Sequence, residues 1–331
     1  MTEYDLIVIG AGPVGENVAD RAVQGGLTAV VVESELVGGE CSYWACMPSK
    51  ALLRSGAVLR AAADVDGAKQ SVRDGVDVAG VLRRRDAMVH DWHDDGQVSW
   101  LEGAGIDLER GHGRVTGLRQ VSVTGADGTV TTLTARHAVA ISTGTAALLP
   151  DVPGLAGIRP WTSRDATGVR DVPASLAIIG GGVVACEMAT AFADLGSRVT
   201  MIVRSRLLSP FEPFAGDLVR AALEERGVEI VTGSEVASAR RDGDAVISLQ
   251  DGREIVAAEV LVATGRVPRT AGIGLDAIGL PDGGWLDVDD TMLVHGTDWL
   301  YAVGDVNHRA LLTHQGKYQA RAAGDVIAAR A

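Results

Sequence analysis

Two cysteines that stand close together in the sequence are the clearest candidates for chemistry. Cys41 and Cys46 lie within the segment 38–50, GGECSYWACMPSK, whereas the third cysteine, Cys186, is far from both in the chain. In a reducing compartment a close cysteine pair is more often catalytic or metal-binding than structural. No second cluster of cysteine and histidine completes a zinc site, so the pair favours redox chemistry, and no metal site is expected.

The geometry of a disulfide restricts the backbone between these two cysteines. Residues five positions apart in an ideal helix have Cα atoms about 8.7 Å apart, whereas a disulfide needs roughly 4.4–6.8 Å. If Cys41 and Cys46 are bridged, the chain between them cannot be a regular helix. Pro48 loosens this turn, because it lacks the N–H group that would bond the carbonyl of Trp44.

A glycine-rich turn near the amino terminus predicts a dinucleotide site that could serve such a pair. Residues 5–15, DLIVIGAGPVG, form a buried-strand run that breaks into a G-x-G-x-x-G turn, and a second β-branched run over 28–32 ends in Glu33. Such glycines allow a tight turn, a close approach to a pyrophosphate and close packing of helix on strand, and the acid can bind an adenosine ribose. The three glycines are Gly10, Gly12 and Gly15.

The same pattern occurs a second time in the chain. Residues 176–185, LAIIGGGVVA, precede an expected helix over 186–195 and a strand over 199–203, and the fingerprint positions hold Gly180, Gly182 and Ala185. Each half also closes with a strand that ends in Thr-Gly, over 138–144 and 260–265. This duplication predicts an α/β protein with two Rossmann-like dinucleotide-binding domains.

The domain boundaries follow from the loops between the two copies. A loop-rich stretch with the sequence DVPG over 151–154 indicates the place where the chain crosses from the first domain to the second. We expect the first domain to occupy 1–150, the second 151–270, and the chain to return to the first domain over 271–331.

The two copies differ where an acid would bind the ribose. The position equivalent to Glu33 is Val203 in the second copy, and Arg204 and Arg206 follow it. Arginine can pair with a 2′-phosphate, whereas a carboxylate would repel it. The second site is therefore predicted to favour NADPH, with NADH as the alternative coenzyme, unless both arginines are merely solvated surface residues.

The composition indicates a folded protein without a nucleic-acid or membrane partner. Its 331 residues suffice for two domains, and hydrophobic and charged residues make up 47% and 22% of them. The net charge of −13 repels phosphate backbones and anionic lipid. No early apolar run could cross a bilayer, and the acidic start does not resemble a signal peptide, so a cytoplasmic location is expected.

The cysteine segment and the glycine turns together resemble a known family. Gly38, Gly39, Cys41, Cys46 and the residues PSK at 48–50 match the motif of the pyridine nucleotide-disulfide oxidoreductases, which include dihydrolipoamide dehydrogenase, glutathione reductase and mercuric reductase. The segment YAVGD at 301–305 matches their flavin motif. The resemblance covers essentially the whole chain and implies a glutathione-reductase-like fold.

The resemblance also implies cofactors and residue roles. The first nucleotide would be FAD, which takes hydride from NAD(P)H, and Cys46 would be the flavin-facing charge-transfer thiol and Cys41 the interchange thiol. Lys50 would lie near the flavin and pair with Glu187, unless Glu187 is only a helix-surface carboxylate. The implied FAD contacts are Gly10, Gly12, Gly15, Glu33, Gly39, Lys50, Gly113, Thr143, Gly144 and Asp305. The implied nicotinamide-coenzyme contacts are Gly180, Gly182, Ala185, Arg204, Arg206, Val236 and Gly265.

The sequence departs from the family at its end. It stops at Ala331, where family members continue into an interface domain that forms the dimer and supplies a His-Glu pair for acid-base chemistry. We therefore expect the fold without an interface domain, either as part of a longer protein or as a shortened variant. If the missing domain exists in the native protein, a homodimer is expected.

The prediction for function is an FAD-dependent oxidoreductase with a redox-active Cys41–Cys46 disulfide. It would pass electrons from NADPH to a small acceptor such as a disulfide or a quinone-like molecule. Two alternatives remain open: an NAD(P)H quinone reductase or oxidase that does not use the disulfide, and a non-catalytic nucleotide-binding redox sensor or truncated remnant.

Overall fold

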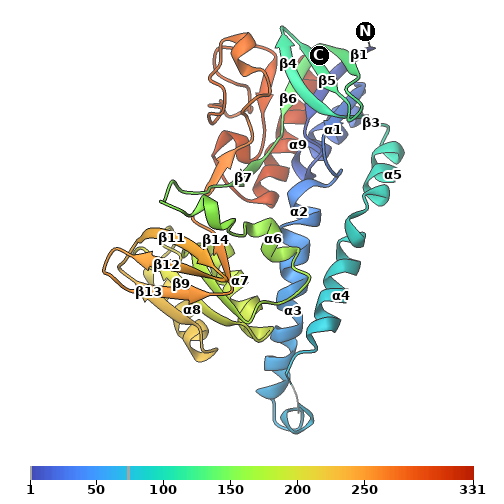
Figure 1. Ribbon diagram of the computed structural model, residues 1–331. Coiled ribbons are helices and arrows are strands. Elements are labelled where there is room, and N and C mark those ends of the chain that lie inside the picture. Colours follow the sequence, from blue (N-terminus) through green and yellow to red (C-terminus); the bar gives the residue numbers. More distant parts are fainter. Residues whose placement is uncertain (1, 73–74) are drawn as a thin grey trace. The chain divides into compact units, whose positions relative to one another are not determined.

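The computed structural model describes residues 2–72 and 75–331, which form two compact units (Figure 1). The first unit contains the described residues up to Tyr43 together with Trp92–Ala146 and Val267–Ala331. The second contains Trp44–Asp91 and Ala147–Arg266. The first unit is therefore assembled from three separate stretches of sequence.

A mixed seven-stranded sheet forms the centre of the first unit. Its strand order is β3-β2-β1-β6-β5-β4, with β16 paired to β6. The strands β3, β2, β1, β6 and β16 run parallel, whereas β4, β5 and β6 pair antiparallel. The strand bounds are β1 Thr2–Ile9, β2 Ala29–Glu33, β3 Asp107–Arg110, β4 His112–Gly117, β5 Gln120–Thr124, β6 Val130–Ile141 and β16 Leu300–Ala302.

Helices α1 (Pro13–Gln24) and α9 (Thr313–Arg330) pack against each other in this unit. Their buried positions are mostly small, as at Ala19, Ala22 and Ala323, so the two helices can approach closely. A proline in the first turn favours the start of α1, because that position has no intrahelical bond to lose. The remaining helical segments of the unit include α2 Gly39–Tyr43, α5 Asp95–Gly103, η4 Leu275–Ile278 and η5 Asp305–Asn307.

The second unit contains a parallel sheet of order β10-β9-β8-β14 and an antiparallel sheet of order β11-β12-β13. Helix α7 packs on β8 and β9, and α3 packs on α4 and α7. Strands β7 Thr145–Ala147 and β15 Arg266–Pro268, most of whose residues belong to the first unit, pair with each other as a two-stranded ribbon. The strand bounds are β8 Ser175–Ile179, β9 Arg198–Val203, β10 Glu229–Thr232, β11 Val236–Asp242, β12 Asp244–Leu249, β13 Glu254–Ala257 and β14 Glu259–Val262. The helical bounds are α3 Cys46–Ala63, η1 Lys69–Ser71, α4 Val78–Met88, η2 His90–Trp92 (which ends in the first unit), η3 Ala156–Ile158, α6 Ser163–Thr167, α7 Val183–Asp194 and α8 Pro213–Glu225.

Both units close in the same way, which confirms the duplication predicted from sequence. In each unit the strand before the glycine turn pairs in parallel with the strand that leads to Thr-Gly, β1 with β6 and β8 with β14. Gly10 and Gly180 have φ angles of +101° and +133°. A Cβ atom would lie 2.5 Å from the Ser142 carbonyl oxygen at Gly10 and 2.3 Å from that of Ala263 at Gly180. Only glycine fits at either turn.

The expected α/β fold is confirmed, with small differences at element ends. The helix predicted over 186–195 begins three residues earlier, at Val183, because Gly182 takes the extended N-cap conformation. Strand β6 ends at Ile141, before its predicted end at 144. In residues 2–72 and 75–331, no helix has both the length and the hydropathy needed to cross a membrane.

Glu16 is a buried carboxyl group in the first turn of α1. Its side chain is largely inaccessible, and within the described part of the chain its Oε1 atom has no hydrogen-bond partner. Burial raises the pKa of Glu16 to about 7, the nearby Lys317 opposes this rise, and the charge of Glu33 adds to it.

Replacing Glu16 with glutamine should stabilise the protein at pH 8 more than at pH 5. The unfolded carboxyl group ionises above its ordinary pKa of 4.5, whereas the folded one ionises only near 7. The free energy of unfolding of the wild type therefore falls as pH rises between these values, by up to about 3 kcal/mol. Thermal unfolding of the wild type and Glu16→Gln at both pH values measures this difference. Glu102→Gln, at an exposed position of α5, serves as control, and an equal gain at both pH values would contradict the prediction.

Candidate functional site

The first glycine turn lies beside the carboxylate that the sequence singled out. Glu33 ends β2, and its Oε2 atom accepts a hydrogen bond of 2.8 Å from the backbone N–H of Ala11 in the turn. Its Oε1 atom accepts one of the same length from the N–H of Glu35. Each carboxylate oxygen can accept more than one hydrogen bond, so the group can also bind ribose hydroxyls.

Two buried hydroxyl groups lie beside this turn. Among the described residues, the side-chain oxygens of Ser142 and Thr143 have no hydrogen-bond partner. Both residues follow the end of β6, and their backbone atoms lie so close to Gly10 that they would contact a Cβ atom there. Buried polar atoms normally have a partner, so this edge of the sheet fits a ligand that carries polar atoms.

The other residues implied for FAD mostly lie in the same unit. Thr145 donates a 2.7 Å hydrogen bond to Asp305 Oδ2, which holds the carboxylate near the ends of β6 and β16. Gly39 approaches the turn so closely that a Cβ atom there would lie 2.9 Å from the Cα atom of Gly12. Lys50 lies in the second unit. The residues placed in the first unit are Gly10, Gly12, Gly15, Glu33, Gly39, Gly113, Thr143, Gly144 and Asp305.

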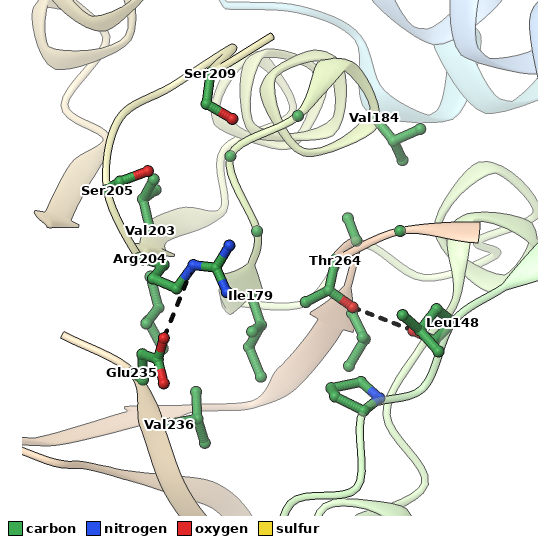
Figure 2. A pocket seen from close by; sticks show the side chains of 18 of the residues that line it. Leu148, Ile179, Val184, Val203, Arg204, Ser205, Ser209, Glu235, Val236 and Thr264 are labelled. Atoms are coloured by element: carbon green, nitrogen blue, oxygen red, sulfur yellow. Dashed lines mark hydrogen bonds and ion pairs between the residues drawn. The ribbon is translucent and has the colours of Figure 1, made fainter. Parts of the chain in front are cut away.

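A cavity of about 630 Å³ opens at the second glycine turn, within the second unit (Figure 2). Gly182 borders open space, because a Cβ atom there would meet nothing within 4 Å. On another side, Thr264 donates a 3.2 Å hydrogen bond to the carbonyl of Leu148. The residues predicted from sequence that line the cavity are Gly180, Gly182, Arg204, Arg206, Val236 and Gly265.

Ala185 is the member of this predicted set that lies elsewhere. It is fully buried in the hydrophobic core of the second unit, on α7. Its small side chain allows α7 to pack on the sheet, which is the physical reason for a small residue at the third fingerprint position.

The two predicted arginines have different surroundings. Arg204 is 82% exposed, and its Nε atom lies 3.8 Å from Oε1 of Glu235. Arg206 donates hydrogen bonds to the carbonyls of Ser209 and Phe211, at 2.7 and 2.9 Å. Glu235 lines the cavity and was missed by the sequence interpretation. The resemblance implies that Val236 contacts the nicotinamide coenzyme, so the position of Glu235 directly before Val236 could have indicated it.

The predicted ion pair between Lys50 and Glu187 is present. The Lys50 Nζ atom lies 2.7 Å from both carboxylate oxygens of Glu187. Lys50 lies on α3 and Glu187 on α7, so the pair joins the helix that begins at Cys46 to the helix of the second glycine turn.

The two cysteines lie in separate helices with a break between them, as a disulfide between them would require. Cys41 lies in α2 and Cys46 is the first residue of α3, with Trp44 and Ala45 between the two helices. Both cysteines are partly buried thiols in this structure.

The turn before Cys46 is held by side chains of the second unit. Thr167 donates a 2.8 Å hydrogen bond to the carbonyl of Trp44, and the Arg164 guanidinium lies 4.0 Å from the centre of the Trp44 ring. Arg85, which is almost wholly buried, donates hydrogen bonds to the carbonyls of Thr167 and Val169. These contacts anchor the backbone that leads into α3.

Comparison with known proteins agrees with this geometry. The sequence profile of the pyridine nucleotide-disulphide oxidoreductases matches residues 4–323. The chain belongs to this family. It is 30% identical over 98% of its length to a mercuric reductase from Staphylococcus aureus and 31% identical over 99% to a dihydrolipoyl dehydrogenase from Chlorobaculum tepidum. It spans 59% and 71% of the lengths of these two family members.

The fold is also that of a solved flavoprotein disulfide reductase. The Cu(II) complex of an HOCl-induced flavoprotein disulfide reductase from Escherichia coli superposes with a TM-score of 0.84 at 22% sequence identity. The match covers 97% of this chain and 70% of the reductase. The predicted glutathione-reductase-like architecture of two dinucleotide-binding units is thereby confirmed.

Cys186 should react with alkylating reagents far more slowly than Cys41 and Cys46. Burial raises the pKa of the Cys186 thiol to about 11, and the charge of Glu187 adds to the rise. At pH 8 only about one Cys186 in a thousand would be a thiolate, which is the reactive form. Peptide mass mapping after timed iodoacetamide treatment of the reduced protein measures the three rates. Equal rates in the folded protein would contradict the prediction, and urea should abolish the difference.

Proposed function

We propose that this chain is an FAD-dependent oxidoreductase that uses NADPH to reduce a small disulfide or a similar acceptor. The observation that carries the proposal is the break between α2 and α3, which leaves Cys46 at the first residue of an 18-residue helix. Helix N-termini stabilise thiolates, and a thiolate is the reactive form in thiol–disulfide exchange. In this proposal Cys41 and Cys46 alternate between a disulfide and two thiols.

The first unit provides the groups that fit FAD. The glycine turn would accommodate the pyrophosphate, Glu33, which accepts from the Ala11 N–H, would also accept from ribose hydroxyls, and the buried hydroxyls of Ser142 and Thr143 would gain partners. Bound FAD would supply two-electron transfer between the nicotinamide and the cysteine pair. We assign 1–150 and 271–331 to the FAD-binding domain and 151–270 to the NAD(P)-binding domain; this assignment differs from the compact units at Trp44–Asp91, which belongs to the second unit.

The second unit provides the groups that bind the nicotinamide coenzyme. The N-terminus of α7 and the open space at Gly182 suit its pyrophosphate. Arg204 and Arg206, which line the same cavity, suit a 2′-phosphate. Glu187 holds the Lys50 ammonium group at α3, one turn after Cys46.

The overall reaction balances without a further reagent. NADPH, one proton and a disulfide yield NADP⁺ and two thiols, so two electrons pass from the nicotinamide to a sulfur–sulfur bond. The acceptor disulfide would be opened by Cys41, which leaves a mixed disulfide that Cys46 resolves to restore the Cys41–Cys46 bond.

The variant Cys46→Ser should lose a spectroscopic signature that the wild type shows. When the FAD-loaded wild type is titrated anaerobically with NADPH, we expect long-wavelength charge-transfer absorbance, because the Cys46 thiolate is the proposed electron donor to the flavin ring. The absorbance should vanish in Cys46→Ser and persist in the control Cys186→Ser. Ordinary flavin bleaching alone in the wild type would refute the disulfide mechanism. Full quinone turnover in Cys41→Ser would instead favour direct reduction, and bound FAD without NADPH consumption would favour a redox sensor.

The second prediction from this proposal concerns the coenzyme. We expect kcat/KM to be higher for NADPH than for NADH, and the ratio to fall about tenfold in Arg204→Gln, because the variant lacks a charge that pairs with the 2′-phosphate. Steady-state kinetics with both coenzymes measure the ratio, and Arg240→Gln, on β11 outside the cavity lining, is the control. A clear preference of the wild type for NADH would overturn the assignment.

A further inference from the structure

The two units differ at the residue that follows the first glycine of each turn, Ala11 in the first unit and Gly181 in the second. In the first unit, the carboxylate of Glu33 binds the N–H of Ala11. In the second unit the equivalent residues are Val203 and Gly181, and a Cβ atom on Gly181 would lie 2.7 Å from the Val203 side chain. The apolar side chain therefore packs on the turn at the place where the first unit has a carboxylate.

A carboxylate reaches the second cavity from the connection between β10 and β11. Glu235 follows β10 and immediately precedes β11, and its side chain is half exposed. It lines the cavity together with Arg204 and Ser205, and its Oε1 atom forms the ion pair with Arg204 Nε (Figure 2). Figure 2 shows this pair on the opposite side of the cavity from Thr264 and Leu148.

We propose that Glu235 determines coenzyme selectivity by holding Arg204 and opposing a 2′-phosphate, so that the protein accepts both NADPH and NADH. This inference rests on the proposed function, because it assigns the adenosine ribose to the end of the cavity that holds Arg204. Glu235 replaces, from the loop before β11, the ribose-binding acid that the second copy lacks at Val203.

The charges at this end of the cavity support a selective role. A 2′-phosphate must compete with Glu235 for the Arg204 guanidinium, and it is repelled by the carboxylate at the same time. An unphosphorylated ribose instead presents hydroxyl groups, which donate hydrogen bonds to a carboxylate. Arg206 differs from Arg204 because its Nη2 group already donates to the carbonyls of Ser209 and Phe211, so only its other N–H groups remain for a phosphate.

The test compares two probes that differ only in the 2′-phosphate, adenosine 2′,5′-bisphosphate and 5′-AMP. Isothermal titration of the FAD-loaded protein gives the affinity of each probe without any turnover. In Glu235→Gln we expect the bisphosphate to bind about tenfold more tightly and 5′-AMP to bind equally or up to about threefold more weakly. In an Arg204→Gln background the gain for the bisphosphate should fall to about twofold or less, because only the direct repulsion by Glu235 is then left to be relieved.

Glu254→Gln is a matched control for the change of charge. Glu254 lies on β13, is also half exposed, and pairs with Arg240 at 3.0 Å, outside the cavity lining. Its substitution should leave both affinities unchanged. An equal change in Glu254→Gln and Glu235→Gln would show a general effect of net charge and would overturn the inference.

The remaining outcomes separate this inference from the proposed function. If Arg204→Gln weakens the bisphosphate while Glu235→Gln changes neither probe, the inference is overturned and the proposed use of NADPH stands. If neither probe binds the wild type, the assignment of the cavity to a nicotinamide coenzyme fails, and the inference fails with it.

Discussion

The structure depends on a close approach, repeated in each unit, between a glycine turn and the end of the strand that closes the sheet. At Gly10 and Gly180 a single added carbon would overlap the carbonyl of the neighbouring strand. This approach brings the end of the closing strand beside the turn, with Ser142 and Thr143 in one unit and Thr264 in the other. The candidate sites of both units lie at these paired edges, so their geometry follows from one backbone constraint.

Local patterns in the sequence were sufficient to predict much of this framework. The glycine fingerprints predicted the strand, turn and helix at both sites, and the Thr-Gly ends predicted which strands close the units. These predictions succeed because each depends on residues that are near one another in the chain. The start of α7 was placed too late, because an extended glycine N-cap has no side chain that marks it.

The parts that were not predicted depend on contacts between distant segments. Glu235 reaches Arg204 only because β10 pairs with β9, and the carbonyl of Trp44 meets Thr167 across more than a hundred residues. Arg85 could not be distinguished from a surface arginine by its sequence neighbours, although it is almost wholly buried. Its guanidinium is satisfied by the carbonyls of Thr167 and Val169, an arrangement that no local spacing reveals.

The packing of α3 on α7 links two positions that are far apart in the chain. Asp194, the last residue of α7, pairs with Arg60, and a Cβ atom at Gly56 would lie 2.1 Å from the Asp194 carboxylate. A protein with a smaller residue at position 194 has room for a side chain at position 56, whereas one that keeps the aspartate does not. Substitutions at positions 56 and 194 are therefore expected to occur together in evolution. A relative without the aspartate is expected to tolerate a side chain in place of the glycine.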